Sequence, residues 1–357
     1  MRILHVSDVY LPRLGGIEMQ VHDLADQQRR RGHGVQVITR TPSGNHEDAL
    51  AVRRLGALAW TRTIAGGEFD GLDVVHCHTS IFSPLAWTYA RSAAAAGVPV
   101  VITMHSIVQP DRGVRTGLRP VFTGLGPVTW TAVSRVAADA LQPLVRTPVQ
   151  ILPNGIDPTP WRRLHSEPPE VATLVSVMRL SARKRALPLV DILAGVRDRL
   201  DPSVPLRAVV IGDGPQRDIM WRAIRRRGLH DWVHLTGRLT REEIAVHLAR
   251  ASMFLAPARL ESFGIAPLEA RCAGVPVLAL LGGGVEEFVR DGVEGRLVAN
   301  DRAMAIAAAE LIAEPERLLL MRKHNTAEVT DLDWPRVVDR TLAVYRSALA
   351  PQPLARS

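Results

Sequence analysis

The hydrophobic and polar positions of the chain form two patterns that alternate along its whole length. Short runs of β-branched and other hydrophobic residues, typical of strands buried on both faces of a parallel sheet, are separated by stretches with helical spacing. Between the first two runs, Ile17, Val21 and Leu24 share one face of a predicted helix, Ile17–Arg31, in which Gln28 is the polar exception. A strand, a helix and a second strand within about 35 residues predict a βαβ unit.

The same alternation continues and predicts two α/β halves. The first half holds the predicted strands Ile3–Ser7, Val35–Thr39, Val74–His78, Val98–Thr103, Thr131–Ser134 and Val149–Leu152. The second half holds Val171–Met178, Leu206–Ile211, Val233–Leu235, Met253–Leu255 and Val275–Leu280, with helical segments near 185–199, 215–227, 240–250, 266–273 and 302–323. Between the halves, the segment Pro153–Pro169 is rich in proline, so we expect neither a helix nor a strand to run through it.

We therefore predict an α/β protein of two Rossmann-like, doubly wound domains that face a central cleft. The first comprises residues 1–153, a linker follows at 154–170, and the second comprises residues 171–334. The final predicted helix, Pro335–Leu349, carries Val338, Leu342 and Tyr345 on one face and is a candidate to cross back onto the first domain. Because open α/β sheets bind ligands at the carboxyl ends of their strands, functional residues are expected directly after strands.

Composition and charge exclude several classes of protein. The 357 residues are 46% hydrophobic and 22% charged, which is ordinary for a globular protein. The 44 basic residues exceed the 36 acidic ones by 8, but the excess is spread along the chain and the arginine runs precede glycines at the ends of helical patterns, as in helix stop signals. No basic stretch is interleaved with aromatic residues, so nucleic acid is not predicted as a partner.

Nothing in the sequence predicts export or a membrane span. No uncharged apolar stretch reaches about 18 residues, and the N-terminus is interpreted as a first strand instead of a signal peptide. Cys77 and Cys272 match no metal-binding or disulfide spacing, so we interpret them as reduced thiols of a cytoplasmic protein.

In the first half, candidate ligand contacts follow the strands. Gly15 and Gly16 precede a helix whose N-terminal N–H groups can face an anion, although a plain tight turn is the alternative. The absence of a G-x-G-x-x-G pattern argues against a nicotinamide enzyme. His105 ends a strand and is expected at the cleft. His76 and His78 lie on one side of the neighbouring strand, and we interpret them as hydrogen-bonding residues instead of metal ligands.

In the second half, cations follow the first strand. Arg179 and Lys184 stand at the end of a strand and the start of the next helix, where positive charge opposes the helix dipole unless an anion is bound. This placement predicts a phosphate or diphosphate site. The neighbouring Arg183 and Arg185 are interpreted as solvated surface cations, and Gly212 to Pro215 as a turn from strand to helix.

The segment from Ala256 to Ala270 carries the strongest signal. Glu261 and Glu269 are separated by seven residues, and Pro267 is predicted to start a helix with Glu269 in its first turn. The loop between them, comprising Ser262, Phe263, Gly264 and Ile265, is expected to point N–H groups at a ligand. The spacing leaves open whether the two carboxylates act as general acid and base or accept hydrogen bonds from polyol hydroxyls.

Taken in order, these motifs resemble the retaining GT-B glycosyltransferases of family 4, the group that contains enzymes of the phosphatidylinositol mannosyltransferase and sucrose synthase kind. The resemblance covers nearly the whole chain. The family's E-x7-E motif falls on Glu261 and Glu269, its diphosphate-binding Arg and Lys on Arg179 and Lys184, and its active-site histidine on His105. Further matches are the glycine-rich loop at Gly15 and Gly16, together with Ser134, Asn154 in Pro153–Asp157, Gly212 in Gly212–Pro215, and Thr236–Gly237.

The chain departs from the family pattern in three places. Ser262 stands where the family often has Gly, the segment Gly282–Glu287 lacks the usual proline before its last glutamate, and Leu278–Leu281 is less polar than is typical. These departures bear on the contacts to the donor sugar and not on the fold.

The resemblance implies transfer of a sugar from a nucleoside diphosphate to an acceptor hydroxyl, with retention of anomeric configuration and without a metal or other cofactor. It implies that Arg179 and Lys184 stabilise the leaving diphosphate, that Glu269 binds the ribose and that Glu261 and His105 lie beside the donor sugar. The acceptor, whether polyol, glycan or lipid-linked, is not identified. The alternatives are a sugar-nucleotide epimerase of the same fold and a non-catalytic protein that binds nucleotide sugars.

Two further segments carry weaker hypotheses. Asp331-Leu332-Asp333 is the one Asp-x-Asp triplet of the sequence, and we interpret it as the start of a helix instead of a metal site. The segment Asp111–Phe122 holds Arg112, Arg115, Leu118, Arg119, Val121 and Phe122. It suggests peripheral contact with an anionic membrane surface, with a solvated loop as the alternative.

Overall fold

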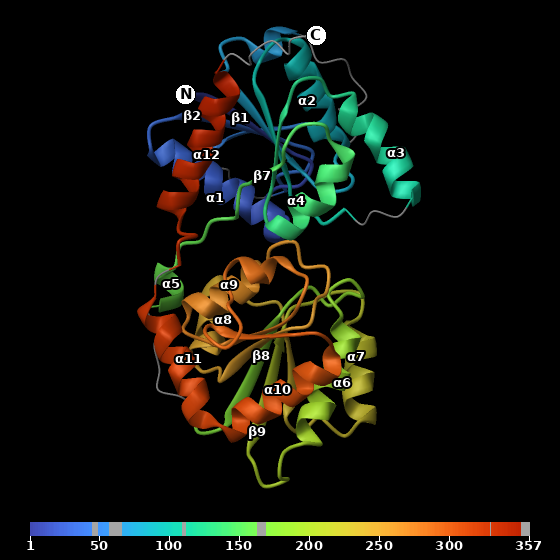
Figure 1. Cartoon of the computed structure of the whole chain (residues 1–357), viewed down its shortest axis with the longest axis vertical. Coiled ribbons are helices and arrows are strands. Elements are labelled where there is room, and N and C mark those ends of the chain that lie inside the picture. The colour runs from blue at the N-terminus through green and yellow to red at the C-terminus, as the bar shows by residue number, and fades with distance from the viewer. Residues whose placement is uncertain (45–48, 57–65, 109–111, 163–168, 329, 351–357) are drawn as a thin grey trace. The chain divides into compact units, whose positions relative to one another are not determined.

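The computed structural model of the chain describes residues 1–44, 49–56, 66–108, 112–162, 169–328 and 330–350 (Figure 1). Backbone contacts divide the chain into two compact units. The first comprises Met1–Gly155 and the segment from Leu332 to the C-terminus, and the second comprises Ile156–Asp331. The division differs from the expected one because residues 156–170 group with the second unit and Leu332–Trp334 with the first.

The first unit is built on a seven-stranded parallel sheet in the order β3-β2-β1-β4-β5-β6-β7. Its strands are β1 (Arg2–Ser7), β2 (Gly34–Thr39), β3 (Ala51–Arg54), β4 (Val74–Thr79), β5 (Val100–Met104), β6 (Thr129–Ala132) and β7 (Gln150–Ile151). The chain leaves β1 toward one edge and β4 toward the other, so the switch point of the topology lies between these two strands. The edge strand β3 was not predicted, because it is short and ends in two arginines, Arg53 and Arg54.

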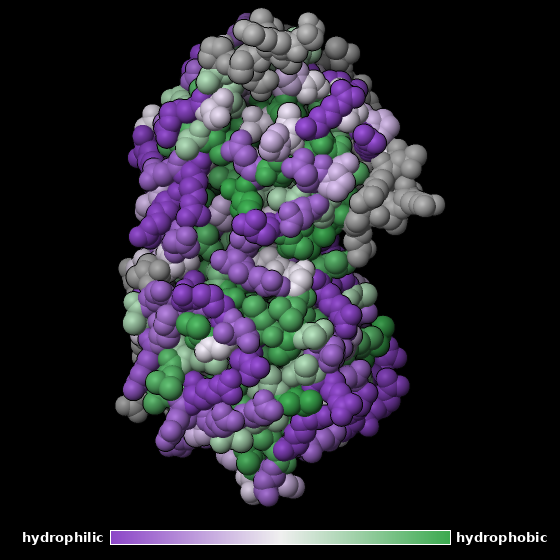
Figure 2. Space-filling model, viewed as in Figure 1, coloured by the Kyte–Doolittle hydropathy of each residue, from purple (hydrophilic) through white to green (hydrophobic). Residues whose placement is uncertain are grey.

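Helices cover both faces of this sheet (Figure 1). Its helices are α1 (Gly16–Arg30), α2 (Pro84–Ala95), α3 (Arg112–Thr123), α4 (Arg135–Leu141) and α12 (Trp334–Leu349). Helices α1 and α12 pack against each other, and α2 packs against β1, β4 and β5. Helix α12 buries Val338, Leu342 and Tyr345, the predicted apolar face, and its outward side is hydrophilic in Figure 2.

The start of α12 confirms the interpretation of the Asp-x-Asp triplet. Asp333 is the N-cap residue, and its side chain accepts a hydrogen bond of 3.0 Å from the backbone N–H of Arg336. Pro335 follows in the first turn, where its missing N–H costs nothing. The carboxylate of Asp333 therefore serves the helix terminus.

The second unit is built on a six-stranded parallel sheet in the order β10-β9-β8-β11-β12-β13. Its strands are β8 (Ala172–Val177), β9 (Leu206–Ile211), β10 (Val233–Gly237), β11 (Met253–Ala256), β12 (Val277–Leu280) and β13 (Gly295–Val298). The short edge strand β13 was not predicted, because Arg296 interrupts its hydrophobic pattern. The switch point lies between the neighbouring strands β8 and β11. Both units are thus Rossmann-like, as predicted.

The helices of the second unit are α5 (Thr159–Arg162), α6 (Ala186–Arg197), α7 (Arg217–Arg226), α8 (Arg241–Ala249), α9 (Ile265–Cys272), α10 (Asp301–Ala313) and α11 (Pro315–Ala327). The single helix predicted near 302–323 is wrong. Two helices, α10 and α11, meet at Glu314, because Pro315 has no N–H to continue the hydrogen-bond ladder of α10. The proline-rich segment also contains one helical turn, α5, and its residues 163–168 lie outside the described ranges.

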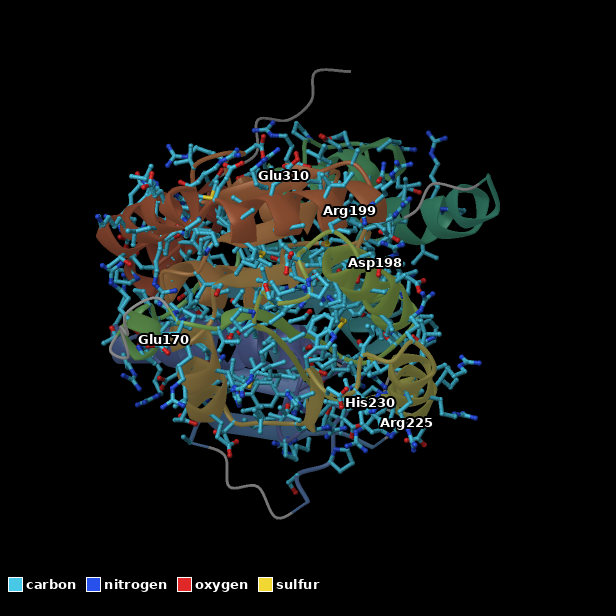
Figure 3. The ribbon with its side chains drawn as sticks, turned by 90° about the horizontal axis from the view of Figure 1, so that it is seen from below. Glu170, Asp198, Arg199, Arg225, His230 and Glu310 are labelled. Carbon is cyan, nitrogen blue, oxygen red and sulfur yellow. The ribbon has the colours of Figure 1, made fainter. Side chains whose placement is uncertain are left out.

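The arginine runs confirm the helix-end interpretation. Helix α1 ends at Arg30 and α7 at Arg226, and Gly32 and Gly228 follow with φ of 83° and 65°. Figure 3 labels Glu170, Asp198, Arg199, Arg225, His230 and Glu310, and among these residues the acidic Asp198 lies beside the basic Arg199.

One apolar residue of the membrane hypothesis, Phe122, is not available to a membrane surface. Phe122 of α3 is 2% exposed, stacks on Trp87 with ring centroids 4.6 Å apart and meets the edge of Trp130. The side chains of Arg112, Arg115 and Leu118, and residue Asp111, lie outside the described part of the structure. Among the described residues, no helix combines the length and the apolar character that a bilayer span requires.

Cys77 and Cys272 are both free thiols, as predicted, and the structure buries both of them. Burial raises the pKa of the Cys272 thiol to about 12 and that of Cys77 further still. Both thiols therefore stay protonated near neutral pH and act as small core residues.

Candidate functional site

In the second unit, the candidate residues meet at the switch point of the sheet. Arg179 and Lys184 follow β8, and Glu261 follows β11, its neighbour in the sheet. Ligands of open α/β sheets bind where neighbouring connections diverge in this way. The sheet order therefore brings together residues that stand 77 positions apart in the sequence.

Lys184 and Glu261 form an ion pair, with 2.6 Å between Lys184 Nζ and Glu261 Oε2. The side chains are 34% and 15% exposed, respectively, so the pair lies at the surface of the unit with the carboxylate the more enclosed partner. An ammonium group has three N–H donors and a carboxylate has two oxygens. Two donors of Lys184 and one oxygen of Glu261 therefore have no partner among the described residues and can contact a ligand.

The loop that carries Arg179 rests on the glycine turn after β9. The backbone N–H of Met178 donates to the carbonyl oxygen of Ile211 at 3.0 Å, and that of Leu180 donates to Asp213 at 2.9 Å. The carbonyl oxygen of Leu180 accepts from the N–H of Gln216 at 3.0 Å. A β-carbon at Gly212 would lie 1.9 Å from the carbonyl oxygen of Met178, so only glycine permits this approach. Gly212 thus allows the turn after β9 to pack directly against the loop that carries Arg179. Arg179 itself is exposed and has no ion-pair partner among the described residues.

The interpretation of Arg185 as a solvated cation is wrong. Its guanidinium donates to both carboxylate oxygens of Asp301, at 2.6 and 2.7 Å, and to the carbonyl oxygen of Pro257 at 3.1 Å. These hydrogen bonds hold the pKa of Asp301 below its usual value. Arg185 also has a φ of 62°, in the left-handed region, at the N-cap of α6. Its contacts therefore stabilise the turn that carries Lys184.

The turn after Glu261 is held by close backbone packing. Gly264, at φ 99°, is the N-cap of α9, and a β-carbon there would lie 2.9 Å from Val285 Cγ2. Gly284 donates its N–H to the carbonyl oxygen of Glu261 at 2.7 Å. The first two N–H groups of α9, those of Ile265 and Ala266, have no acceptor within the ranges that the structure describes.

The start of α9 differs from the prediction. The helix begins at Ile265 instead of Pro267, so Glu269 is its fifth residue and lies beyond the first turn. Glu269 is 8% exposed. Phe263 is 2% exposed and its ring lies against Phe288, at a centroid distance of 5.6 Å, so its side chain belongs to the core. Ser262 and Ile265 are half-buried.

Replacing Gly284 by alanine is expected to distort the Glu261 turn. The added β-carbon would lie 2.3 Å from the carbonyl oxygen of Ser262 and 2.6 Å from Phe263 Cα, and these backbone atoms cannot move aside alone. We expect the second unit to lose about 1–3 kcal/mol of stability and the protein at least about tenfold in activity. Urea unfolding and a transfer assay measure the two effects.

Gly283→Ala is the matched control. Its β-carbon would lie 3.4 Å from the carbonyl oxygen of Glu261, close to ordinary contact, and its backbone is extended at φ −119°. This variant is expected to stay within about 1 kcal/mol of the wild type. Equal losses in both variants would contradict the steric explanation.

In the first unit, Gly15 and Gly16 stand at the start of α1. Gly15 is the N-cap and Gly16 is exposed with open space around it. A β-carbon at Gly15 would lie 2.4 Å from Glu18 Oε2, so the carboxylate of Glu18 lies over this helix terminus. Glu18 also forms a 3.0 Å ion pair with Arg13. The helix dipole is therefore already complemented by an acidic side chain.

Asn154 precedes Gly155, whose backbone is hydrogen-bonded to α1. The side-chain amide of Gln20 donates to the carbonyl oxygen of Gly155 at 2.9 Å and accepts from its N–H at 3.0 Å. Asn154 lines a small pocket of the first unit together with His105, His78 and Trp334. Ser134 does not line this pocket; its hydroxyl caps α4 by accepting from the N–H of Ala137 at 3.2 Å.

His105 is the last member of a row of buried histidines. His5 of β1 contacts His78 of β4 with 2.9 Å between Nδ1 and Nε2, and His78 Nδ1 contacts His105 Nε2 at 3.1 Å. His76 lies beside them, its ring centroid 4.1 Å from that of His78. The predicted hydrogen-bonding role of His76 and His78 is confirmed.

Burial keeps these histidines neutral. Desolvation lowers the pKa of His5 and of His105 to about 4, although the hydrogen bond to Gln28 partly opposes it at His5. Desolvation and the neighbouring histidines lower the pKa values of His76 and His78 well below the usual 6.5. A neutral imidazole has one donor and one acceptor nitrogen, so each ring has a defined direction in the row.

Two groups of side chains have the ligand types and closeness of a metal site. His5, His76 and His78 form the first, and Glu294, His324 and Glu328 the second. The nitrogens of the first group are engaged in hydrogen bonds within the unit. In the second, Glu294 and Glu328 both pair with Arg290. Arg290 therefore supplies positive charge to these two carboxylates, as a metal ion would.

The described structure brings some of the predicted residues together and reveals others. Lys184, Glu261 and Gly264 adjoin one another, while Glu269 lies deeper on α9. Four supporting residues were missed: Arg185, Gly284, Gln28 and Tyr345. The polar exception at Gln28 and the glycine run at 282–284 were visible in the sequence, but neither pattern indicates which residues they contact in the fold.

The chain matches two family descriptions that adjoin each other. Residues 14–159 match Glycosyltransferase Family 4, and residues 159–325 match Glycosyl transferases group 1. One subunit of human phosphatidylinositol N-acetylglucosaminyltransferase is 27% identical over 96% of this chain and 75% of its own length. Glycogen synthase of Mycobacterium tuberculosis is 28% identical over 99% of this chain and 97% of its own.

Solved structures share the fold. Anabaena Alr3699/HepE, solved in complex with UDP-glucose, superposes with a TM-score of 0.79 at 20% identity, covering 97% of this chain and all of that one. WaaG, described as a glycosyltransferase involved in lipopolysaccharide biosynthesis, superposes with a TM-score of 0.74 at 17% identity over 96% of this chain and 99% of its own. The two matched regions together span most of the chain, and the fold agrees with them. The chain therefore belongs to the GT-B glycosyltransferases of family 4.

Proposed function

We propose that the protein transfers a sugar from a nucleoside-diphosphate donor to an acceptor hydroxyl, with retention of anomeric configuration and without a metal ion. The Lys184–Glu261 pair carries this proposal, because it places a cation and a carboxylate together at the switch point, beside the first N–H groups of α9, which have no acceptor among the described residues. A diphosphate leaving group needs positive charge, and a sugar needs an acceptor for its hydroxyls. The pair and the helix terminus offer both.

The roles of the other residues follow from their positions. Arg179 is exposed at the end of β8, where it supplies a second cation for the diphosphate. Together with Lys184 it takes the part that a divalent ion plays in other sugar transferases, so we expect activity to survive EDTA. The complex of the similar Anabaena protein with UDP-glucose supports a nucleotide sugar as donor.

Retention is proposed to proceed without a covalent intermediate on the protein. The carboxylate of Glu261 is held by Lys184, so it serves hydroxyl binding better than nucleophilic attack. The leaving phosphate then takes up the acceptor proton on the same face of the sugar. His105 is assigned to the transferred sugar and Glu269 to the ribose hydroxyls.

A donor screen tests this function. The full-length protein is incubated with UDP-, GDP- and ADP-sugars, with polyol, glycan and lipid-linked acceptors, and in the presence of EDTA. Release of nucleoside diphosphate is measured, and the anomeric proton of the product is observed by NMR. We expect one donor and acceptor pair to react with retention, and Glu261→Gln to abolish the reaction.

The controls separate the alternative functions. A sugar nucleotide converted without any acceptor would identify an epimerase. Binding of a nucleotide sugar without turnover of any pair would identify a non-catalytic binding protein. Either result would overturn the proposal.

A further inference from the structure

The buried histidines of the first unit belong to one longer hydrogen-bond network that ends at a backbone carbonyl group. Besides the row His5, His78 and His105, the network includes a second branch through Tyr345 of α12, His76 of β4, Thr103 of β5 and Thr131 of β6. Gln28 of α1 joins the branches, since its amide contacts both His5 Nε2 at 2.7 Å and the Tyr345 hydroxyl at 3.2 Å. The side chains of all these residues are buried.

The direction of the second branch follows from its terminus. Thr131 Oγ1 lies 3.1 Å from the carbonyl oxygen of Ile102, which can only accept, and we assign the hydroxyl proton of Thr131 to this contact. The 2.6 Å contact between Thr103 and Thr131 then uses the hydroxyl proton of Thr103. Thr103 Oγ1 is therefore an acceptor for His76 Nε2, 2.7 Å away, and His76 carries its proton on Nε2.

The same reasoning continues through the tyrosine to the glutamine. His76 Nδ1 has no proton, so the hydroxyl of Tyr345, 2.7 Å away, donates to it. The oxygen of Tyr345 then accepts from Gln28, and the atom of Gln28 that faces it is the amide nitrogen. This places the amide oxygen of Gln28 toward His5.

The donors and acceptors in the histidine row follow from the orientation of the Gln28 amide. His5 Nε2 donates to the amide oxygen of Gln28, so His5 Nδ1 is unprotonated and accepts from His78 Nε2. His78 Nδ1 is in turn unprotonated and accepts from His105 Nε2. His105 therefore carries its proton on Nε2. Burial lowers the pKa values of all four histidines, which keeps each ring in a single neutral tautomer.

We infer that this network imposes the Nε2–H tautomer on His105, so that His105 Nδ1 presents an unprotonated lone pair and Gln28, Tyr345 and Thr131 act as positioning residues. His105 lines the pocket of the first unit, and no described residue hydrogen-bonds its Nδ1. A ligand group that faces this nitrogen must donate a hydrogen bond, as a sugar hydroxyl does. The catalytic consequence rests on the proposed function; the tautomer does not.

Nitrogen NMR of the full-length, ¹⁵N-histidine-labelled protein tests the inference, because protonated and unprotonated ring nitrogens have distinct shifts. The spectrum of His105→Gln identifies the signals of His105. We expect the wild type to show Nε2 protonated and Nδ1 unprotonated. A protonated Nδ1 in the wild type would overturn the inference.

Thr131→Val and Thr131→Ser form the decisive pair. Valine removes the acceptor of the Thr103 hydroxyl, so Thr103 is expected to donate to His76 Nε2 instead, which reverses the network and protonates His105 on Nδ1. Serine keeps the hydroxyl and is expected to keep the wild-type tautomer. If Thr131→Val does not fold, Tyr345→Phe replaces it and is expected to populate both tautomers. An unchanged tautomer in the folded variant would contradict a positioning role.

Sugar transfer supplies the second readout. We expect kcat/KM to fall about tenfold in Thr131→Val, which corresponds to the loss of one hydrogen bond, and to stay within about twofold in Thr131→Ser. A tautomer that reverses without any change in kcat/KM would confine the network to a structural role. Failure of the wild type to transfer any sugar would reject the proposed function and leave the NMR result standing.

Discussion

Lys184→Met is expected to lower the kcat of sugar transfer by about 10²–10³-fold, the effect of removing one preorganised group that stabilises developing negative charge. Methionine keeps the length of the side chain and removes its charge. Two of the three N–H donors of Lys184 stay available beside its 2.6 Å ion pair with Glu261, so they can contact phosphate oxygens of the leaving group. Initial rates at saturating donor measure the effect.

Lys184→Arg refines this expectation. The chain uses arginine for 42 of its 44 basic residues, yet lysine stands here. An ammonium is a compact point charge, whereas a guanidinium is a planar fork with fixed directions. Arginine keeps the charge but cannot match the 2.6 Å contact to Glu261 from the same backbone position, so we expect a loss of about tenfold.

Arg183→Met is the matched control for both variants. Arg183 is exposed, precedes Lys184 directly and has no ion-pair partner among the residues described. The Arg183→Met substitution removes one positive charge from the same loop, and we expect activity within about twofold of the wild type. A similar loss in Arg183→Met and Lys184→Met would show that the general positive charge of the loop matters, and not the placement of Lys184.

Acid is expected to destabilise the first unit well before the carboxylates titrate. His5 and His105 have pKa values of about 4 in the folded protein and about 6.5 when unfolded. The unfolded chain therefore binds protons between pH 6.5 and 4 while the folded chain does not, and stability falls as the pH falls through this window. At pH 4 each of these two histidines contributes about 3 kcal/mol of destabilisation.

This loss is large compared with the total stability of a domain, about 5–15 kcal/mol. His76 and His78, whose pKa values are lowered in the same direction, add to it. Urea unfolding of the full-length protein between pH 8 and pH 4.5 measures the change. The transition of the first unit is expected to move to lower urea as the pH falls.

His5→Gln isolates the histidine contribution. It removes one buried titrating group, so the slope of stability against pH near pH 5 should fall by the equivalent of about one proton. His230→Gln is the control, because His230 belongs to the second unit and the transition of the first unit should keep its slope. An unchanged slope in His5→Gln would mean that other groups cause the acid sensitivity.

Much of the fold could be predicted because it depends on local patterns. Central strands such as β1 and β9 are buried on both faces and appear as continuous hydrophobic runs, and the strand Leu206–Ile211 was predicted with its observed bounds. The short edge strands β3 and β13 were missed, because edge strands bury less and tolerate charged residues such as Arg53 and Arg296.

The candidate site likewise contains residues that the sequence could identify and residues whose role only the fold reveals. Lys184 and Glu261 could be identified from their types and their places after strands. Arg185 could not be distinguished from a solvated cation, because its partner, Asp301, lies 116 residues away. Phe122 had helical spacing suited to a membrane face, but its place between Trp87 and Trp130 depends on the packing of α2 and β6.

The sequence by itself determined the two α/β units, the helix ends and the residue types at the carboxyl ends of the strands, because these follow from periodicity, capping and the order of motifs along the chain. Only the tertiary structure decided which polar groups pair. A hydrogen bond depends on atoms that lie within about 3 Å of each other, and strand order brings together residues from distant segments. Gln28 was a polar exception in the sequence, and in the fold it joins Tyr345 and His5 in the network that ends at His105.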